Sequence, residues 1–346
     1  MIIKLSEAHI IGAIISYLLG VFIVPLVISY SEKQGLIDEP NERKIHRKPI
    51  SRLGGIAIWL STMLTFLFLV FLSYYPYGSL VSGILLGSSL MFFLGLIDDI
   101  YNLDAKFKLF IQIAIVTLVY FLGVKIDTII NPFGGVIHLG HFSYIITVLW
   151  IVGISNAVNF IDGVDGLAGS VITVNSITLA IIAVAMVPPS PISALIGFIL
   201  AGSMLAFLTY NFNPAKIFMG DSGALFAGFL LAALSITGVM KAAALAIILP
   251  FVVLAVPIAD ITYSSLRRIS KGKSPFVADA EHIHHKLLKA GFTQKKTVLI
   301  LTSVAVFAGA VAAFFAGSIK HYIAYILALI VIMVVLNLIK IFKKSA

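Results

Sequence analysis

The chain has 346 residues, of which 60% are hydrophobic and 11% charged, and its mean hydropathy is +1.09. Soluble globular domains hold roughly 45 to 50% apolar residues, so the composition excludes a soluble protein and indicates an integral membrane protein. The formal net charge of +9 is explained by the excess of Lys and Arg in the cytoplasmic loops of membrane proteins. We therefore expect no nucleic-acid partner. The chain has no cysteine, which excludes disulfides and thiolate chemistry.

Long apolar runs recur along the whole chain. A helix needs about 20 apolar residues to cross a hydrocarbon core of about 30 Å. The runs are continuous and lack the alternation of a barrel, so each is predicted to be a helix. The first run lacks a signal-peptide cleavage site and is predicted to be retained. We predict an all-α helical bundle forming one domain over 1–346, with eleven spans at 8–30, 53–74, 79–97, 107–124, 142–159, 167–187, 191–210, 222–239, 242–264, 298–316 and 320–340.

An odd number of spans places the termini on opposite sides of the membrane. One set of loops and adjoining helix ends holds 20 of the 24 Lys and Arg residues, so the positive-inside rule predicts that this set and the C-terminus are cytoplasmic and the N-terminus is outside. Thirteen of the 15 acidic residues share that side, although the orientation rule does not require them there, and they indicate a site. The predicted cytoplasmic loops are about 31–52, 98–106, 160–166, 211–221 and 265–297, and the outer segment 125–141 is predicted to form a short hairpin.

The segment GLIDDIYNLDAKFKL places Asp98 and Asp99 at the cytoplasmic end of the third span, followed by Asp104, Lys106 and Lys108. Adjacent carboxylates repel one another, and partial desolvation raises that cost, so the pair favours a nearby cation such as Mg²⁺ or a proton-accepting role. The alternative is a solvated loop with a charged helix end.

The segment SNAVNFIDGVDGLAG spaces Asn156, Asn159, Asp162 and Asp165 by three residues. Neighbours at this spacing share a helix face, and the glycines after Asp162 predict a turn whose backbone N–H groups can approach a phosphate closely. The alternative is a pair of capping residues between two spans, which explains one or two of the four polar residues but not all of them.

The segment FMGDSGALFAGF places Asp221 where the eighth span begins. An Asp at this position is a favoured N-cap, which is the plain structural explanation. The same geometry suits catalysis, because a helix N-terminus binds anions and an Asp there can hold a metal that bridges to the anion.

The segment EHIHHKLLKAGF supplies His282, His284 and His285 in the largest predicted cytoplasmic loop. Their spacing is weak evidence for a closed zinc site. Imidazoles that donate hydrogen bonds to a diphosphate fit the chemistry of the other motifs better. A solvated histidine cluster is the alternative.

Two further residues are candidates on position alone. Arg52 stands before a Gly-Gly pair at the mouth of a span and is a candidate phosphate contact, while most charges of its loop are explained by membrane orientation. Asp260 lies inside the ninth predicted span, where a carboxylate indicates function unless it pairs with Arg267 or Arg268.

In the predicted topology these motifs all reach one face of the membrane. They bring carboxylates for a metal and Lys, Arg and His side chains for phosphates to the edge of a lipid phase. This combination favours phosphoryl transfer from a soluble, highly charged donor to a lipid acceptor.

At these residues the sequence resembles the polyprenyl-phosphate N-acetylhexosamine-1-phosphate transferases, which include the phospho-MurNAc-pentapeptide translocase. The resemblance extends from GLIDEPNERKIHRKPISRLGG through LIDD, NAVNFIDGVDGLAG and GDSGALFAG to HIHHKLL. The HIHH form, in place of three consecutive histidines, is similar to the branch that uses UDP-GlcNAc. Asp104 departs from a strict Asp-Asp-x-x-Asp spacing and receives a lesser role.

The resemblance implies a multi-pass enzyme of the prokaryotic cytoplasmic membrane, active on its cytoplasmic face. Its implied donor is a UDP-N-acetylhexosamine, its acceptor undecaprenyl phosphate or a similar polyprenyl phosphate, its cofactor Mg²⁺ or Mn²⁺, and its products UMP and the lipid-diphosphate-linked sugar that starts cell-envelope polysaccharide synthesis. A homodimer is compatible with this assignment. The implied roles are metal ligation by Asn159 and Asp221, catalysis at the lipid phosphate by Asp98 and Asp99, and substrate binding by Arg52, Lys106, Lys108, Asn156, Asp162, Asp165, His282, His284 and His285.

Two reaction routes and two rival classes stay open at this stage. The lipid phosphate, largely a dianion at neutral pH, attacks the donor directly, or an Asp first forms a covalent phospho-sugar intermediate. A secondary transporter also has many spans, but its site lies at the midplane, often between inverted repeats, and no repeat is evident here. An intramembrane prenyltransferase or CDP-alcohol phosphotransferase also uses Asp-rich motifs. DDIYNLD lacks the tight acid spacing typical of the former, and DGVDGLAG lacks the Ala-Arg pair and later paired acids typical of the latter.

Overall fold

The computed structural model describes residues 7–38, 49–72, 78–130, 135–185, 189–239, 251–252, 254–270 and 282–316. Within these residues eight helices are long and apolar enough to cross a membrane, and the chain is an all-α polytopic membrane protein. The eight are α1 (Glu7–Gln34), α2 (Gly54–Phe71), α3 (Ser79–Tyr101), α5 (Phe142–Ile161), α6 (Leu167–Ala185), α7 (Pro191–Asn211), α8 (Gly220–Leu234, continued by the π-helix η1, Ser235–Val239) and α12 (Gln294–Phe315).

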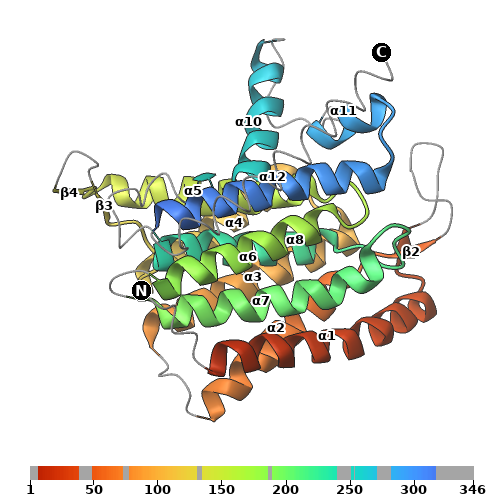
Figure 1. Ribbon diagram of the computed structural model, residues 1–346, viewed down its shortest axis with the longest axis horizontal. Coiled ribbons are helices and arrows are strands. Elements are labelled where there is room, and N and C mark those ends of the chain that lie inside the picture. Colours follow the sequence, from red (N-terminus) through yellow and green to blue (C-terminus); the bar gives the residue numbers. More distant parts are fainter. Residues whose placement is uncertain are drawn as a thin grey trace.

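Shorter elements complete the described fold. The helix α4 (Ala105–Phe121) has 17 residues and lies in the bundle, whereas α10 (Ala255–Ser270) and α11 (Ile283–Lys289) lie beside it (Figure 1). Two antiparallel pairs of short strands join helices: β1 (Ile37–Asp38) with β2 (Ile50–Ser51), and β3 (Thr128–Ile130) with β4 (Val136–His138). The second pair confirms the hairpin predicted at 125–141.

The predicted spans correspond to observed helices from α1 to α8 and again at α12. The stretch predicted as a span at 242–264 differs, because its described part enters α10, which continues to Ser270 inside the predicted cytoplasmic loop. In Figure 1 α10 stands away from the common direction of the bundle, and its last turn carries Arg267 and Arg268. Residues 240–250 and the predicted span 320–340 lie outside the described residues. The count of eleven spans, the orientation and the single domain therefore stay predictions.

The helix α8 lies at the centre of the bundle (Figure 1) and packs against α3, α5 and α2. Every residue from Ser222 to Leu234 is buried. The sequence explains this position, because a helix that is apolar or small on all sides can be covered on all sides by its neighbours.

Two glycines let neighbouring helices approach the first turn of α8. A Cβ placed on Gly95 of α3 would lie 2.5 Å from the backbone of Asp221, and one on Gly55 of α2 would lie 2.3 Å from the backbone nitrogen of Gly223. Small residues permit such close helix contacts in membranes. Because Asp99 follows Gly95 by one helical turn, this contact also carries the Asp99 carboxylate to the start of α8.

The polar connections gather at one end of the bundle. The turns from α3 to α4, from α5 to α6 and from α7 to α8 lie there together with the β1–β2 pair, whereas the β3–β4 pair lies at the other end (Figure 1). The last of these turns is fixed to β2, since Phe218 N donates to Ser51 O at 2.7 Å and Gly54 N donates to Phe218 O at 3.0 Å.

Candidate active site

Asp99 is bound to the first turn of α8. Its carboxylate accepts hydrogen bonds from Asp221 N at 2.7 Å, Ser222 N at 3.0 Å and Ser222 Oγ at 2.7 Å. The unpaired N–H groups at a helix start attract a carboxylate, and here the carboxylate comes from another helix. Gly220 allows the approach, because its φ of +70° and its contact with the Asp99 oxygens both exclude a larger side chain.

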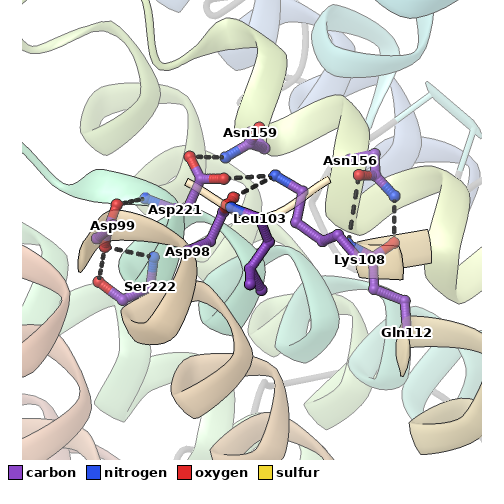
Figure 2. A network of polar contacts seen from close by, with 9 residues as sticks. All are labelled: Asp98, Asp99, Leu103, Lys108, Gln112, Asn156, Asn159, Asp221 and Ser222. Atoms are coloured by element: carbon purple, nitrogen blue, oxygen red, sulfur yellow. Dashed lines mark hydrogen bonds and ion pairs between the residues drawn. The ribbon is translucent and has the colours of Figure 1, made fainter. Parts of the chain in front are cut away.

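Lys108 lies between two carboxylates, as Figure 2 shows. Its Nζ donates to Asp98 Oδ2 and to Asp221 Oδ2, each at 2.6 Å. The other oxygen of Asp98 accepts the backbone N–H of Leu103 at 2.7 Å, which fixes the turn between α3 and α4. One ammonium group therefore links the end of α3, the start of α4 and the start of α8.

Asn159 completes this network from α5. Its Nδ2 donates to Asp221 Oδ1 at 2.9 Å, so both carboxylate oxygens of Asp221 are bound by side chains (Figure 2). Asn156 lies about one turn before Asn159 in α5, where its Nδ2 donates to Gln112 Oε1 at 2.7 Å. Gln112 is fully buried, so this amide pair lies deeper in the bundle than the charged residues.

A cavity of about 460 Å³ opens beside the network. Seven of the residues predicted for the site line it: Arg52, Asp99, Asn159, Asp162, Asp165, Asp221 and His285. Arg52 forms an ion pair with Asp38, and both residues lie on the cavity wall.

Asp162 lies in the turn between α5 and α6 and is half-buried. Burial raises the pKa of Asp162 to about 7, and the carboxylate of Asp221 acts in the same direction. A carboxyl group that titrates near neutral pH can hold or release a proton as charge enters the cavity.

Asp165 is tied to the loop that precedes α8. Its Oδ2 accepts Asn213 Nδ2 at 3.0 Å and the backbone N–H of Ala215 at 3.1 Å. Gly166 N in turn donates to Asn211 Oδ1 at 3.0 Å. Asp165 thus lines the cavity and also holds its wall in place.

The three histidines lie at different depths. His285 lines the cavity, whereas His284 is buried against Gly163, and His282 Nδ1 lies 2.7 Å from Asp260 Oδ2. Burial and the neighbouring imidazoles together lower the pKa of His284 to about 4. Burial also lowers the pKa of His285. Both rings are therefore neutral at pH 7 and offer hydrogen bonds without a positive charge.

Two predicted residues stand apart from the cavity. The side chain of Lys106 is exposed, and its backbone N–H is bound by Asp104, which caps α4. Asp104 accepts hydrogen bonds from Lys106 N at 3.0 Å and Phe107 N at 3.3 Å. Its observed contacts are those of an N-cap.

Sequence reasoning missed several residues of the site. Ser222 donates two hydrogen bonds to Asp99, and its place directly after Asp221 at a predicted helix start was a usable signal. Asp38 and Gln294 line the cavity from distant segments. Asp38 lies in the GLIDEPN stretch that carries the family resemblance, which was a usable signal, whereas no local pattern marks Gln294.

The donor set around Asp221 suits a hard divalent cation. Lys108 pairs with the carboxylates of Asp98 and Asp221, and the Asp99 carboxylate binds Asp221 N beside them, so three carboxylates share a single ammonium group, which leaves an excess of negative charge. Among the described residues no group of three Asp, Glu or His side chains forms a closed metal cage. Mg²⁺ does not require one, because it usually takes one or two protein carboxylates together with substrate phosphates and water.

The described structure is thus a helical membrane bundle with a charged cavity at one end. The family model described as glycosyl transferase family 4 matches residues 81–239. A Bacillus subtilis (strain 168) protein, named probable undecaprenyl-phosphate N-acetylglucosaminyl 1-phosphate transferase, is 34% identical over 294 residues, 84% of this chain and 80% of its own length.

Two further relatives have similar names. The decaprenyl-phosphate N-acetylglucosaminephosphotransferase of Mycobacterium leprae (strain TN) is 32% identical over 335 residues, covering 86% of this chain and 81% of its own. The undecaprenyl-phosphate alpha-N-acetylglucosaminyl 1-phosphate transferase of Escherichia coli (strain K12) is 27% identical over 282 residues, covering 80% and 75%. The chain belongs to glycosyl transferase family 4, and the family resemblance of its motifs is confirmed.

Proposed function

We propose that the protein transfers N-acetylglucosamine 1-phosphate from UDP-N-acetylglucosamine to undecaprenyl phosphate, releasing UMP. The observation that carries this proposal is the network of Asp98, Lys108, Asp221 and Asn159 beside the cavity at one end of a membrane bundle. The relatives in Bacillus and Escherichia are named for undecaprenyl phosphate and the relative in Mycobacterium for decaprenyl phosphate, and all three are named for N-acetylglucosamine phosphate transfer, which supports this sugar phosphate and a polyprenyl-phosphate acceptor.

The cavity suits a nucleotide diphosphate sugar in size. Small-molecule sites commonly enclose about 300 to 1,000 Å³, and this cavity of about 460 Å³ falls in that range. Arg52 on its wall and Lys108 beside it supply positive charge for a diphosphate. Asp165, Asn211 and Gln294 supply uncharged or acceptor groups on the remaining wall, where the uridine half of the donor can bind.

We further propose that Mg²⁺, with Mn²⁺ as the alternative, binds at Asp221 and Asn159. The bound cation would neutralise charge on the donor diphosphate. Asp221 offers carboxylate oxygens and Asn159 an amide oxygen, both of the hard type that Mg²⁺ prefers. Lys108 holds Asp221 on the side of Asp98 and compensates part of the negative charge of the pair.

The site supports direct attack by the lipid phosphate on the sugar-linked phosphorus. In that step one P–O bond forms, the P–O bond to UMP breaks, and UMP leaves with the bonding electrons. All four oxygens of Asp98 and Asp99 accept hydrogen bonds, from Leu103 N, Lys108 Nζ and the first turn of α8. Such engaged carboxylates are better suited to orienting the acceptor and taking a residual proton than to forming a covalent intermediate.

The proposed orientation places this site at the cytoplasmic face, with eleven spans and the N-terminus outside. The distribution of Lys and Arg supports it, since 20 of 24 lie on the predicted cytoplasmic side. A soluble nucleotide sugar and a membrane-anchored acceptor would then meet at the end of the bundle.

A panel of donors tests the substrate assignment. Purified protein with undecaprenyl phosphate and Mg²⁺ is given UDP-GlcNAc, UDP-GalNAc, UDP-glucose or CDP-glycerol, and the released nucleotide is identified by chromatography. We expect UMP from UDP-GlcNAc, with loss of activity in EDTA and recovery on adding Mg²⁺ or Mn²⁺. Release of CMP from CDP-glycerol, or substrate flux across proteoliposomes without UMP, would instead support the rival classes.

A further inference from the structure

Asp260 of α10 is a buried carboxylate that the proposed mechanism does not use. It is 2% exposed, and its Oδ1 accepts the backbone N–H of Ile283 at 2.7 Å. Its Oδ2 lies 2.7 Å from Nδ1 of His282, which is itself 5% exposed. A single side chain on α10 thereby holds both the first residue of α11 and the histidine before it.

The His282 ring is also held on its faces. It stacks on Phe160 of α5, with ring centroids 5.4 Å apart and planes at 23°, and on His284, with centroids 5.7 Å apart and planes at 6°. Phe160 directly follows Asn159, which binds Asp221. The ring therefore joins three elements next to the network of charged residues.

The contacts of Asp260 with His282 and Ile283 also affect the rest of the histidine segment, residues 282–285. His284 packs on Gly163 in the turn that lines the cavity, and His285 lines the cavity itself. Because α11 has only seven residues, fixing His282 and Ile283 at its start restricts where the following two imidazoles can lie. The contact made on α10 thus constrains the segment that places His285 on the cavity wall.

A carboxylate beside Nδ1 also selects the chemical state of an imidazole. It favours the tautomer with the proton on Nδ1, which directs Nε2 to the opposite side of the ring, and it stabilises the ring when that nitrogen is protonated. Among the described residues, the titratable side chains in contact with His282 include Asp260 on α10 and His284 and His285 on α11, while Phe160 on α5 carries no charge.

We propose that Asp260 is a positioning residue of the transfer reaction, acting through His282 to orient the histidine segment at the cavity. The proposal rests on the proposed function, because it assigns the histidines to the phosphates of that reaction. It adds to the site a residue that lies on α10, outside the cavity and outside the charged network of Figure 2.

A double-mutant cycle tests the proposal. We expect Asp260→Asn and His282→Gln each to lower kcat for UMP release about tenfold or more, the scale on which loss of a functional histidine's partner acts. If Asp260 acts through His282, the double variant should lose no more than His282→Gln alone. Asp260→Glu should recover part of the loss of Asp260→Asn, because it restores a carboxylate. Losses that multiply in the double variant, or equal activity in Asp260→Glu and Asp260→Asn, would overturn the proposal.

The matched control is Asp127→Asn, on the exposed segment before β3, which we expect to retain wild-type turnover. Thermal unfolding of each variant in detergent separates a loss of fold from a loss of positioning. A drop in melting temperature that accounts for the whole loss of activity would assign Asp260 a structural role alone and would overturn the proposal.

A second measurement does not depend on activity. In protein labelled with ¹⁵N-histidine, the His282 resonances are assigned by their absence in His282→Gln. We expect the Nδ1–H tautomer in the wild type and a mixture of tautomers in Asp260→Asn. If the wild-type protein releases no UMP, the proposed function fails, while this spectrum still decides whether Asp260 fixes His282. An unchanged spectrum in Asp260→Asn would reject the positioning role.

Discussion

The Asp99 carboxylate accepts the backbone N–H of Asp221 at 2.7 Å, so one acidic residue caps the helix on which the other stands. This relationship determines the direction of the Asp221 side chain. With the start of α8 satisfied by Asp99, Asp221 is not required as a cap, and its carboxylate extends to Lys108 and Asn159. The two acids therefore have different tasks, one holding the helix and one facing substrate.

Replacing Asp99 by Asn should impair both stability and turnover. One oxygen becomes an NH₂ group that faces the N–H donors of Asp221 and Ser222. We expect a loss of about 1 to 3 kcal/mol in the free energy of unfolding and a fall of about 100-fold in UMP release. Thermal unfolding and a UMP assay measure the two effects. Wild-type turnover in a folded Asp99→Asn protein would show that this carboxylate is dispensable.

The two lysines at the start of α4 should differ sharply. Lys108 lies 2.6 Å from both Asp98 and Asp221, whereas Lys106 is exposed and outside the cavity. Lys108→Met leaves two carboxylates facing each other without a cation, so we expect a loss of about 100-fold in kcat/KM. Lys106→Met should lower kcat/KM far less, because it removes only an exposed surface charge. Equal losses in the two variants would contradict the observed geometry.

The sequence predicted the class of fold because long apolar runs can only be helices in lipid. It also predicted the segments of the site, since LIDD, NFIDG and MGDSG place polar groups at the ends of apolar helices. These ends meet in the structure through a helix contact whose partner the motifs do not identify. Gly95 allows α3 to reach α8, and this contact brings Asp99 to the first turn of that helix.

Other parts of the site depend on contacts between distant segments, which a single sequence does not reveal. Asn156 and Asn159 are one case. The fully buried Gln112 of another helix binds Asn156, whereas Asn159 binds Asp221. The place of Asp260 is another. Sequence reasoning weighed it against Arg267 and Arg268 on its own helix, whereas its observed partners are His282 and Ile283.

Replacing Gly163 by Ala should displace the His284 ring without unfolding the protein. A Cβ there would lie 2.6 Å from Nε2 of His284, the far end of a side chain that can move. We expect Gly163→Ala to lower UMP release about tenfold or more with little change in melting temperature. Gly153→Ala is the control, since nothing lies within 4 Å of its added Cβ. The idea fails if both variants behave like the wild type.

Asp162 should make stability fall as the pH rises. Its pKa is about 7 in the folded protein and near the ordinary value of 3.8 when unfolded, so between these limits the unfolded chain binds fewer protons. The folded state is therefore penalised progressively from about pH 4 to pH 7. We expect Asp162→Asn, without Mg²⁺, to gain melting temperature relative to the wild type as the pH is raised from 5 to 8. A difference that stays constant over this range would show that the carboxyl group titrates normally.

The central claim is that sugar and phosphate move together to the lipid. UDP-GlcNAc carrying ³H in the sugar and ³²P in its sugar-linked phosphate is given to the purified protein with undecaprenyl phosphate and Mg²⁺, and lipid and water phases are then counted. The account predicts both labels in the lipid in equal amounts, unlabelled UMP in water, and loss of both signals in Asp221→Asn. Transfer of ³H alone, with ³²P left in released UDP, would mean ordinary glycosyl transfer and would contradict it.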